Sequence, residues 1–249
     1  MKNTQELKVL AQAHHEAMLE TCNNNVPVTI YDQFVPEHSG CERELPIDIT
    51  VTENDTVTEI FIDHGDMIPN SVVCALNFAS FFNPGGGFLN GSYAQEESLC
   101  MYSNLYEILS RQSEFYTYNK EHSGDIPGGY LNRAIYTQEV TFAKNGITRK
   151  IDILTCACPN KSVKYLQENP EINRGLLYSR IKFILDIAED QCVETLILGA
   201  WGCGVFKQNP EEVASIFKEL LNDKRYQFTK VIFAIPSGNN NTVFKKNIL

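Results

Sequence analysis

The second half of the sequence alternates short apolar segments with longer helical ones, and this alternation constrains the fold more than any other feature. Buried strands are expected at 151–157, 194–198 and 230–234, and helices between them at 171–189 and 210–222. A strand, a helix and a second strand in succession imply a crossover connection, which makes neighbouring strands parallel. We therefore predict an α/β domain with a largely parallel or mixed sheet and helices on both faces.

The first half is less regular. Good helix formers predict a helix over 4–22, and short strands are expected at 47–52 and 57–63. The apolar run at 71–79 is typical of a buried strand, and apolar residues at helical spacing predict a helix over 97–116.

An Asn-Gly pair at residues 145 and 146 predicts a β-hairpin. Apart from a short asparagine run at 239–241, no linker, repeat or low-complexity segment interrupts the chain. The pattern favours one domain over two.

Charge and cysteine usage exclude several classes of function. The net charge of −10 gives no general attraction to polyanions, so coating of DNA or RNA is not expected. No apolar run reaches the ~18 residues of a membrane span, and the first residues, MKNTQELKVLAQ, lack a signal-peptide core. The eight cysteines lie mostly in apolar segments without zinc-site spacing, which predicts reduced thiols in a cytoplasmic compartment.

Two glycine-rich segments follow predicted strands. NPGGG, at 83–87, follows the strand at 71–79, and GAWGCGVFKQNP, at 199–210, follows the strand at 194–198. Ligands of open α/β sheets bind beyond the carboxyl ends of strands, where consecutive backbone amides can surround a phosphate without lysine. Neither segment has the Gly-Lys-Ser/Thr of an ATP-binding loop or a full dinucleotide fingerprint, which disfavours ATP hydrolysis and hydride transfer. The alternative is that each segment is only a tight turn.

The acids Glu96 and Glu97 follow Gln95 at the start of a predicted helix. Neighbouring residues on a helix point about 100° apart, so this pair cannot flank one bond from opposite sides as the acids of most glycosidases do. One acid can instead reach the scissile bond while the other holds a sugar hydroxyl. The alternative is that the acids only complement the helix dipole.

The spacing GGG-x7-QEE, within NFASFFNPGGGFLNGSYAQEESLCMYSNLY, resembles the signature of poly(ADP-ribose) glycohydrolases, in particular of their microbial branch. DILTCACPN, LILGAWGCGVFKQNP and KVIFAI occur in the order of that family, and the likeness covers nearly the whole chain. The resemblance implies a three-layer α/β/α macrodomain with a mixed central sheet. It would span 1–249, with about 1–45 as an N-terminal helical extension packed on it.

The resemblance also implies hydrolysis of the ribose–ribose O-glycosidic bond of poly(ADP-ribose), with release of ADP-ribose. Glu97 would be the general acid and base, Glu96 would bind ribose hydroxyls, and Gln95 would support the same grip. No metal or cofactor is implied.

The substrate-binding residues implied by the resemblance lie in the two glycine-rich segments. The first segment would lie against the ribose and diphosphate, and the second would wrap the diphosphate, with its phenylalanine beside the terminal ribose. These residues are Asn83, Gly85, Gly86, Gly87, Gly202, Cys203, Gly204, Val205 and Phe206. The Cys203 thiol is expected to fill space rather than act as a nucleophile, and the adenine pocket has no assigned residue.

Two other functions fit the same motifs. The chain could cleave mono-ADP-ribose from a protein side chain such as arginine, or from nucleic acid, because the motifs identify the ADP-ribosyl group better than the leaving group. It could also be a non-catalytic reader of ADP-ribose, although a reader has no need of Glu97. In each case the partner is an ADP-ribosylated molecule, with neither a membrane nor general nucleic-acid binding.

Overall fold

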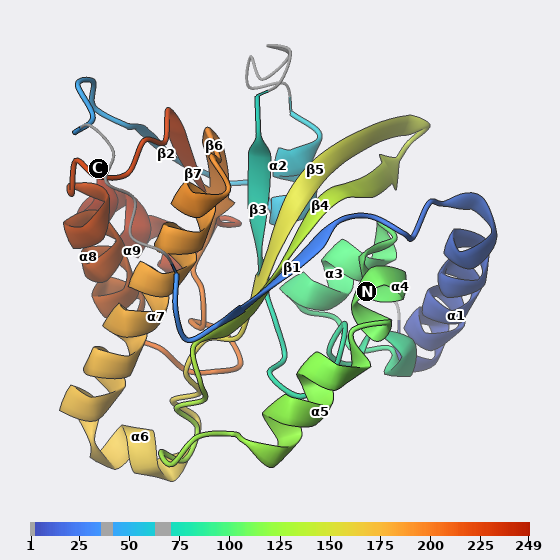
Figure 1. The fold of residues 1–249 in the computed structure, drawn as a ribbon, viewed down its shortest axis with the longest axis horizontal. Coiled ribbons are helices and arrows are strands. Elements are labelled where there is room, and N and C mark those ends of the chain that lie inside the picture. Colours follow the sequence, from blue (N-terminus) through green and yellow to red (C-terminus); the bar gives the residue numbers. More distant parts are fainter. Residues whose placement is uncertain (1–2, 36–41, 63–70) are drawn as a thin grey trace.

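A seven-stranded mixed sheet runs through the centre of the computed structural model, which describes residues 3–35, 42–62 and 71–249 (Figure 1). The strand order is β1-β4-β5-β3-β6-β7-β2; the β1–β4 and β4–β5 pairs are antiparallel and all other pairs are parallel. The strands are β1 (Val28–Asp32), β2 (Asp48–Thr52), β3 (Val73–Phe78), β4 (Arg133–Lys144), β5 (Ile147–Cys156), β6 (Thr195–Leu198) and β7 (Lys230–Ala234).

Helices cover both faces of the sheet. They are α1 (Thr4–Thr21), α2 (Thr56–Ile60), the 3-10 turn η1 (Phe88–Asn90), α3 (Gln95–Met101), α4 (Leu105–Ser110), α5 (Ser113–Glu121), α6 (Lys164–Glu168), α7 (Pro170–Asp190), α8 (Pro210–Leu221) and α9 (Asn239–Ile248). Apolar residues of α7, α8 and α9 form one core cluster, and those of α1 to α5 form the other.

The central strand β3 divides its side chains between the two clusters. Cys74 and Leu76 pack into the cluster under α7 and α8, whereas Ala75 between them packs into the other. Alternate side chains of a strand point to opposite faces, so a strand buried on both faces is apolar throughout. The predicted three-layer α/β/α architecture with a mixed sheet is confirmed.

Local signals account for most of the predicted elements. Asn3 and Glu6 form a capping box at the start of α1, each side chain accepting from the other residue's amide. Asn145 and Gly146 both have positive φ, as the tight turn between β4 and β5 requires. The helices at 171–189 and 210–222 are α7 and α8, each with a proline in its first turn.

The predicted strand at 57–63 is wrong. Its first residues form α2, because the Asp55 side chain accepts from Thr58 N at 2.6 Å and caps a helical turn. Val57 and Ile60, three residues apart, are buried on the same side of that turn. Residue 63 lies outside the described residues.

The predicted continuous helix at 97–116 is also wrong, because it is divided into α3, α4 and α5. At the first break, Ser103 forms a β-bridge with Phe142, and the Asn104 amide donates to Thr141 O at 3.3 Å. Pairing with β4 therefore takes backbone groups that a continuous helix would use. Strand β1 and helices α6 and α9 are not predicted from the sequence; α9 begins at the first residue of the asparagine run at 239–241.

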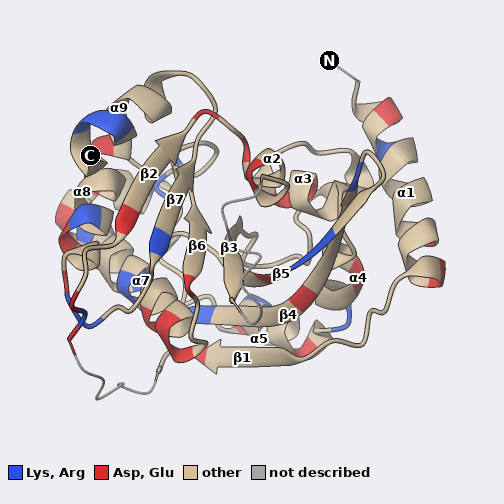
Figure 2. Ribbon diagram, turned by 90° about the horizontal axis from the view of Figure 1, so that it is seen from above, with Lys and Arg blue, Asp and Glu red and all other residues tan. Residues whose placement is uncertain are grey.

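Charged residues of both signs are interspersed over the elements (Figure 2). Several of the cations form ion pairs. Lys182 and Arg225 both contact Asp186, and Lys245 contacts Glu53. In the described part of the chain, no helix is long and apolar enough to cross a bilayer. Seven cysteines have free thiols, and Cys41 lies outside the described residues.

Candidate active site

The two glycine-rich segments leave neighbouring parallel strands at the same edge of the sheet. β3 ends at Phe78 and leads to the segment at 83–87, which we call the first loop. β6 pairs with β3 in parallel and ends at Leu198, before the segment at 199–209, which we call the second loop. The predicted positions of both loops at carboxyl ends of strands are confirmed.

Glu97 lies between the first loop and the start of its own helix. Its Oε1 accepts the Gly87 amide at 2.9 Å, and its Oε2 accepts the Ala94 amide at 3.0 Å. The residue is only 8% exposed. Two backbone donors therefore fix the carboxyl group in one orientation, at the positive end of α3.

Glu96 points in a different direction and is buried more deeply, at 3% exposed. Its Oε2 accepts the Ser80 amide at 2.7 Å, and its Oε1 lies 3.3 Å from Asn77 Nδ2. Burial raises the pKa of Glu96 to about 8, because loss of solvent outweighs these donors. A neutral acid is therefore available at this position near neutral pH.

Gln95 fastens α3 to the end of β3. Its Oε1 accepts the Phe78 amide at 2.9 Å, and its Nε2 donates to Leu76 O at 2.8 Å and to Thr56 Oγ1 at 3.2 Å. These bonds occupy the polar atoms of the side chain. The Gln95 amide therefore holds the start of α3, which carries Glu96 and Glu97, against the end of β3. The predicted contact of Gln95 with ribose stays a prediction.

The first loop requires glycine because side chains of the protein itself lie very close to its backbone. Gly86 has φ +58°, and a Cβ placed on it would lie 2.6 Å from Glu97 Oε1 and 2.9 Å from Glu96 Oε2. A Cβ on Gly85 would meet Tyr106, and one on Gly87 would meet Ser92. The first loop therefore packs closely against the carboxylates of Glu96 and Glu97, and an alanine at position 86 would displace them.

Asn83 begins this turn and is exposed. Its carbonyl accepts the Gly86 amide at 3.1 Å. The predicted contact between Asn83 and substrate stays a prediction.

The second loop leaves backbone donors free. Within the described part of the chain, the amides of Gly204, Val205 and Phe206 have no hydrogen-bond acceptor. A Cβ on Gly204 would meet nothing within 4 Å, and Val205 is 72% exposed. Three consecutive unpaired N–H groups beside open space form the kind of site that binds a phosphate.

Two other residues of the second loop are packed against the protein. A Cβ on Gly202, which has φ +74°, would lie 2.5 Å from Cys158 Sγ. Cys203 is partly buried and its Sγ lies 3.6 Å from Trp201 O. Burial raises the pKa of the Cys203 thiol to about 12, so this thiol is a poor nucleophile.

The Phe206 ring lies next to an aromatic group that sequence reasoning missed. Its centroid is 6.5 Å from that of Tyr130, which in turn stacks on Phe81 at 4.6 Å. Tyr130 belongs to the segment between α5 and β4, and no local motif marks it. The three rings therefore form a row of contacts from Phe206 in the second loop to Phe81, just before the first loop.

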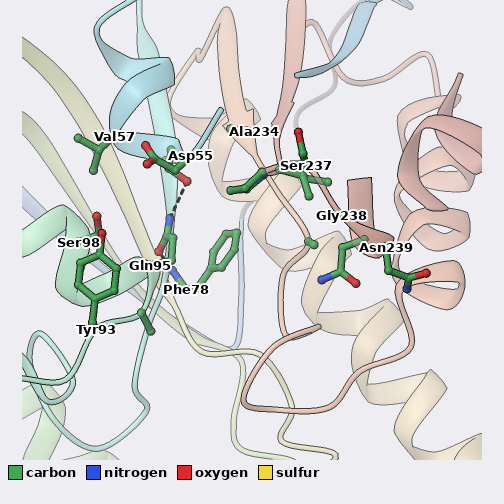
Figure 3. Close-up of a pocket in the computed structure, with 16 residues that line it drawn as sticks. Asp55, Val57, Phe78, Tyr93, Gln95, Ser98, Ala234, Ser237, Gly238 and Asn239 are labelled. Atoms are coloured by element: carbon green, nitrogen blue, oxygen red, sulfur yellow. Dashed lines mark hydrogen bonds between the residues drawn. The ribbon is translucent and has the colours of Figure 1, made fainter. Parts of the chain in front are cut away.

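Two adjoining cavities, of about 540 and 260 Å³, lie along the loops. Phe78 and Gln95 line both cavities, and the larger one extends between α2 and the segment after β7 (Figure 3). The residues of the larger cavity that sequence reasoning missed include Asp55, Val57, Tyr93, Ser237, Gly238 and Asn240. They come from segments far apart in the chain, so no spacing could have indicated them.

The cavities are not basic. Among the described residues that line them there is no lysine or arginine, and Asp55 is acidic. In the same described residues, no group of three or more histidine, cysteine, aspartate or glutamate side chains is placed to hold a metal ion.

Comparison with known proteins places this chain in a family. The model of the catalytic domain of microbial-type poly(ADP-ribose) glycohydrolases (PARG) matches residues 4–145. The crystal structure of the Thermomonospora curvata PARG is 26% identical and has a TM-score of 0.83, covering 98% of this chain and 99% of that one. The same enzyme bound to the inhibitor ADP-HPD is similar at 26% identity over 97% and 99% of the two chains, with a TM-score of 0.80.

A second solved structure extends the likeness to another organism. The PARG of Deinococcus radiodurans in complex with ADP-ribose is 26% identical, with a TM-score of 0.72, over 98% of this chain and 90% of that one. No curated protein sequence matches the chain.

Proposed function

The chain belongs to the microbial-type poly(ADP-ribose) glycohydrolase family, and on this premise we propose that it hydrolyses the ribose–ribose O-glycosidic bond of poly(ADP-ribose) and releases ADP-ribose. The observation that carries the proposal is the position of Glu97. Its carboxyl group is fixed by the amides of Gly87 and Ala94, between the two loops that would hold the substrate. A reader of ADP-ribose would not require an acid held in this way.

Glu97 acts as both general acid and general base. As a carboxylic acid it gives a proton to the departing ribose oxygen while positive charge develops on the anomeric carbon. As a carboxylate it then takes a proton from the attacking water. Glu96, on the neighbouring helical position, holds hydroxyl groups of the ribose and orients the bond.

The diphosphate binds at the second loop. The unpaired amides of Gly204, Val205 and Phe206 support this placement, because they offer donors to phosphate oxygens without adding positive charge. The Phe206 ring lies beside the terminal ribose, and Gly85, Gly86 and Gly87 line the opposite side. The amides of Gly86 and Gly87 already have acceptors, so the first loop acts mainly by shape.

The nucleobase occupies the larger cavity. The ring of Phe78 and the side chain of Val57 offer apolar walls, and Asp55 offers an acceptor for a base amino group. The volume of about 540 Å³ is in the range of sites for small ligands. This arrangement extends the nucleotide from the end of β7 to the acid pair.

The function is tested by what the protein releases. The purified protein is incubated with poly(ADP-ribose), with ADP-ribosyl-arginine protein and with ADP-ribosyl-carboxylate protein, and the products are separated by chromatography. We expect ADP-ribose from the polymer. Release from only one of the mono-ADP-ribosylated proteins would replace the proposed substrate, and release from none would contradict the proposed function.

We also propose that the protein works in the cytoplasm and has no general affinity for nucleic acid. The free thiols of the described cysteines and the net charge of −10 support these two points. Cell fractionation with an antibody to the protein tests the first, and a gel-shift assay with unmodified DNA and RNA tests the second.

A further inference from the structure

A buried arginine close to the second loop has no part in the proposed mechanism. Arg180 of α7 is only 1% exposed. Its guanidinium group donates to four neutral oxygen atoms, which are the carbonyls of Ala157, Gly129 and Tyr130 and the Oδ1 atom of Asn132. The bonds to Asn132 and Tyr130 are 2.6 and 3.0 Å long. The N–H groups of Arg180 are therefore well used, but none of them meets a carboxylate.

No anionic side chain compensates the charge of Arg180. Among the ion pairs of the described residues, none involves it. The titratable groups that act on it are Cys156, Cys158 and Tyr130. Burial raises the pKa of the Cys156 thiol to about 11 and that of Cys158 well above its usual range, so both thiols are neutral. Burial also lowers the pKa of Arg180, but a guanidinium group keeps its charge in proteins.

A second buried arginine shows the more usual arrangement. Arg133 of β4 is 6% exposed, and its Nε lies 3.3 Å from Asp32 Oδ1. A buried charge is costly unless an opposite charge accompanies it, because water no longer solvates it. The carbonyls around Arg180 satisfy its hydrogen bonds and leave its charge unbalanced. Such a charge becomes favourable when a ligand brings an anion close to it.

One short segment, 157–159, contacts both Arg180 and the second loop. Its first carbonyl accepts from Arg180. Its middle residue, Cys158, has its Sγ 2.5 Å from where a Cβ on Gly202 would lie. Its last carbonyl accepts Gln208 Nε2 of the second loop at 2.8 Å. The guanidinium group is therefore close to the loop that is proposed to hold the diphosphate.

A second connection runs through Tyr130. Its carbonyl accepts from Arg180, and its ring centroid lies 6.5 Å from that of Phe206 in the second loop. Tyr130 has φ +57°, a left-handed conformation that is uncommon for residues other than glycine. Arg180 thus holds an unusual backbone conformation on one side of the second loop and the end of β5 on the other.

We propose that Arg180 is a positioning residue whose buried charge attracts the diphosphate of the substrate to the second loop without touching it. The unpaired amides at 204–206 supply hydrogen bonds, and Arg180 supplies the positive charge that the described lining of the cavities lacks. In a low-dielectric interior a charge acts beyond contact distance and is screened little by salt. The proposal deepens the proposed function and rests on it, since it takes the diphosphate to lie at the second loop.

Asn132→Asp tests the charge without changing Arg180. Aspartate has nearly the shape of asparagine and keeps an oxygen for Arg180 Nε, but it supplies the missing negative charge. The Ser179 hydroxyl, which accepts from Asn132 Nδ2 at 2.9 Å, can donate to the new carboxylate instead. We expect the free energy of unfolding not to fall. The affinity for ADP-ribose, measured by calorimetry, should fall roughly tenfold, the order that Coulomb's law gives for one charge near a diphosphate.

Asn132→Leu separates the charge from the hydrogen bond. It removes the acceptor of Arg180 Nε and leaves the positive charge uncompensated. We therefore expect the free energy of unfolding to fall, whereas the affinity of the folded protein for ADP-ribose stays close to that of wild type. A purely structural role of Arg180 predicts the opposite order, with the larger loss of affinity in Asn132→Leu. That order would overturn the inference.

Asn25→Asp is the matched control for one added negative charge, because Asn25 is exposed in the segment between α1 and β1. We expect its affinity for ADP-ribose to equal that of wild type. Equal affinities of Asn132→Asp and Asn25→Asp would overturn the role of Arg180 and leave the proposed function standing. Failure of wild type itself to bind ADP-ribose would instead contradict the proposed function.

Discussion

The two glycine loops at the edge of the sheet use their backbones in opposite ways. In the first loop the amides of Gly86 and Gly87 are already bonded, and a Cβ on Gly86 would collide with the carboxylates of Glu96 and Glu97. In the second loop the amides from Gly204 to Phe206 are unpaired, and a Cβ on Gly204 would meet nothing within 4 Å. The first loop therefore shapes the enzyme's own acids, whereas the second is free to bind a ligand.

This difference shows that richness in glycine does not by itself identify a phosphate-binding loop. The two loops differ in whether their backbone amides already donate hydrogen bonds within the protein. Four substitutions test this contrast between the two loops.

The largest effect is expected for Glu97→Gln, which keeps the side-chain shape in the first-loop region but removes the titrating group. We expect turnover of poly(ADP-ribose) to fall by about 10²–10⁴-fold, the usual contribution of a positioned acid and base. Binding of ADP-ribose, measured by calorimetry, should persist because the second loop is intact. Equal turnover by the variant and wild type would remove Glu97 from the mechanism.

Glu96→Gln should change the pH dependence of stability. The pKa of Glu96 is raised from 4.5 to about 8 in the folded protein, so the contribution of Glu96 to the stability of wild type is fully present below pH 4.5 and declines until the pH reaches about 8. Glutamine does not titrate. Relative to wild type, the free energy of unfolding of the variant should therefore rise across this pH range, by up to about 5 kcal/mol.

Chemical denaturation at several pH values measures this difference. A difference between variant and wild type that stays constant with pH would show that Glu96 titrates alike in the folded and unfolded chains. The second loop has no comparable buried acid, so substitutions there should leave the pH dependence unchanged.

Gly86→Ala should damage the first loop by displacing the two carboxylates. A shift of about 1 Å at reacting groups costs roughly 10²-fold in rate, and a left-handed alanine costs about 1–2 kcal/mol of stability. Turnover and the free energy of unfolding are both measured. Gly175→Ala in α7 is the matched control, because a Cβ there meets nothing within 4 Å and no positive φ is required. Similar turnover by the two variants would contradict the close packing of the first loop against Glu96 and Glu97.

Gly204→Val should have the smallest of these effects and should act on binding alone. A Cβ at this position meets no protein atom within 4 Å, and the valine side chain fills the space in front of the free amides. We therefore expect the affinity for ADP-ribose to fall about tenfold, which corresponds to the loss of one or two hydrogen bonds. The free energy of unfolding should change by less than about 0.5 kcal/mol. Unchanged affinity by calorimetry would contradict the placement of the diphosphate at the second loop.

Local chemistry explains which parts of this molecule could be predicted from its sequence. The capping box of Asn3 and Glu6, the turn at Asn145 and the regular alternation after β5 are short-range signals, and the corresponding elements are present. The strand expected at 57–63 failed because the cap from Asp55 outweighed the β-branched residues around it. The helix expected at 97–116 failed because a distant strand pairs with Ser103.

The site follows the same division. The Gln95-Glu96-Glu97 motif and both loops could be identified from spacing, since each lies within one short segment. Tyr130 could not be, because it meets the rings of Phe81 and Phe206 only in the folded chain. Which amides are left unpaired is also a property of the folded chain and has no signal in sequence.

The described lining of the two cavities has no lysine or arginine, and this has a consequence for the conditions in which the enzyme works. Proteins that hold polyanions with lysine and arginine release bound counterions, and their affinity falls steeply as salt is added. Within the described lining of the two cavities there is no such side chain to be screened. The affinity of this enzyme for a phosphorylated substrate should therefore vary little with ionic strength.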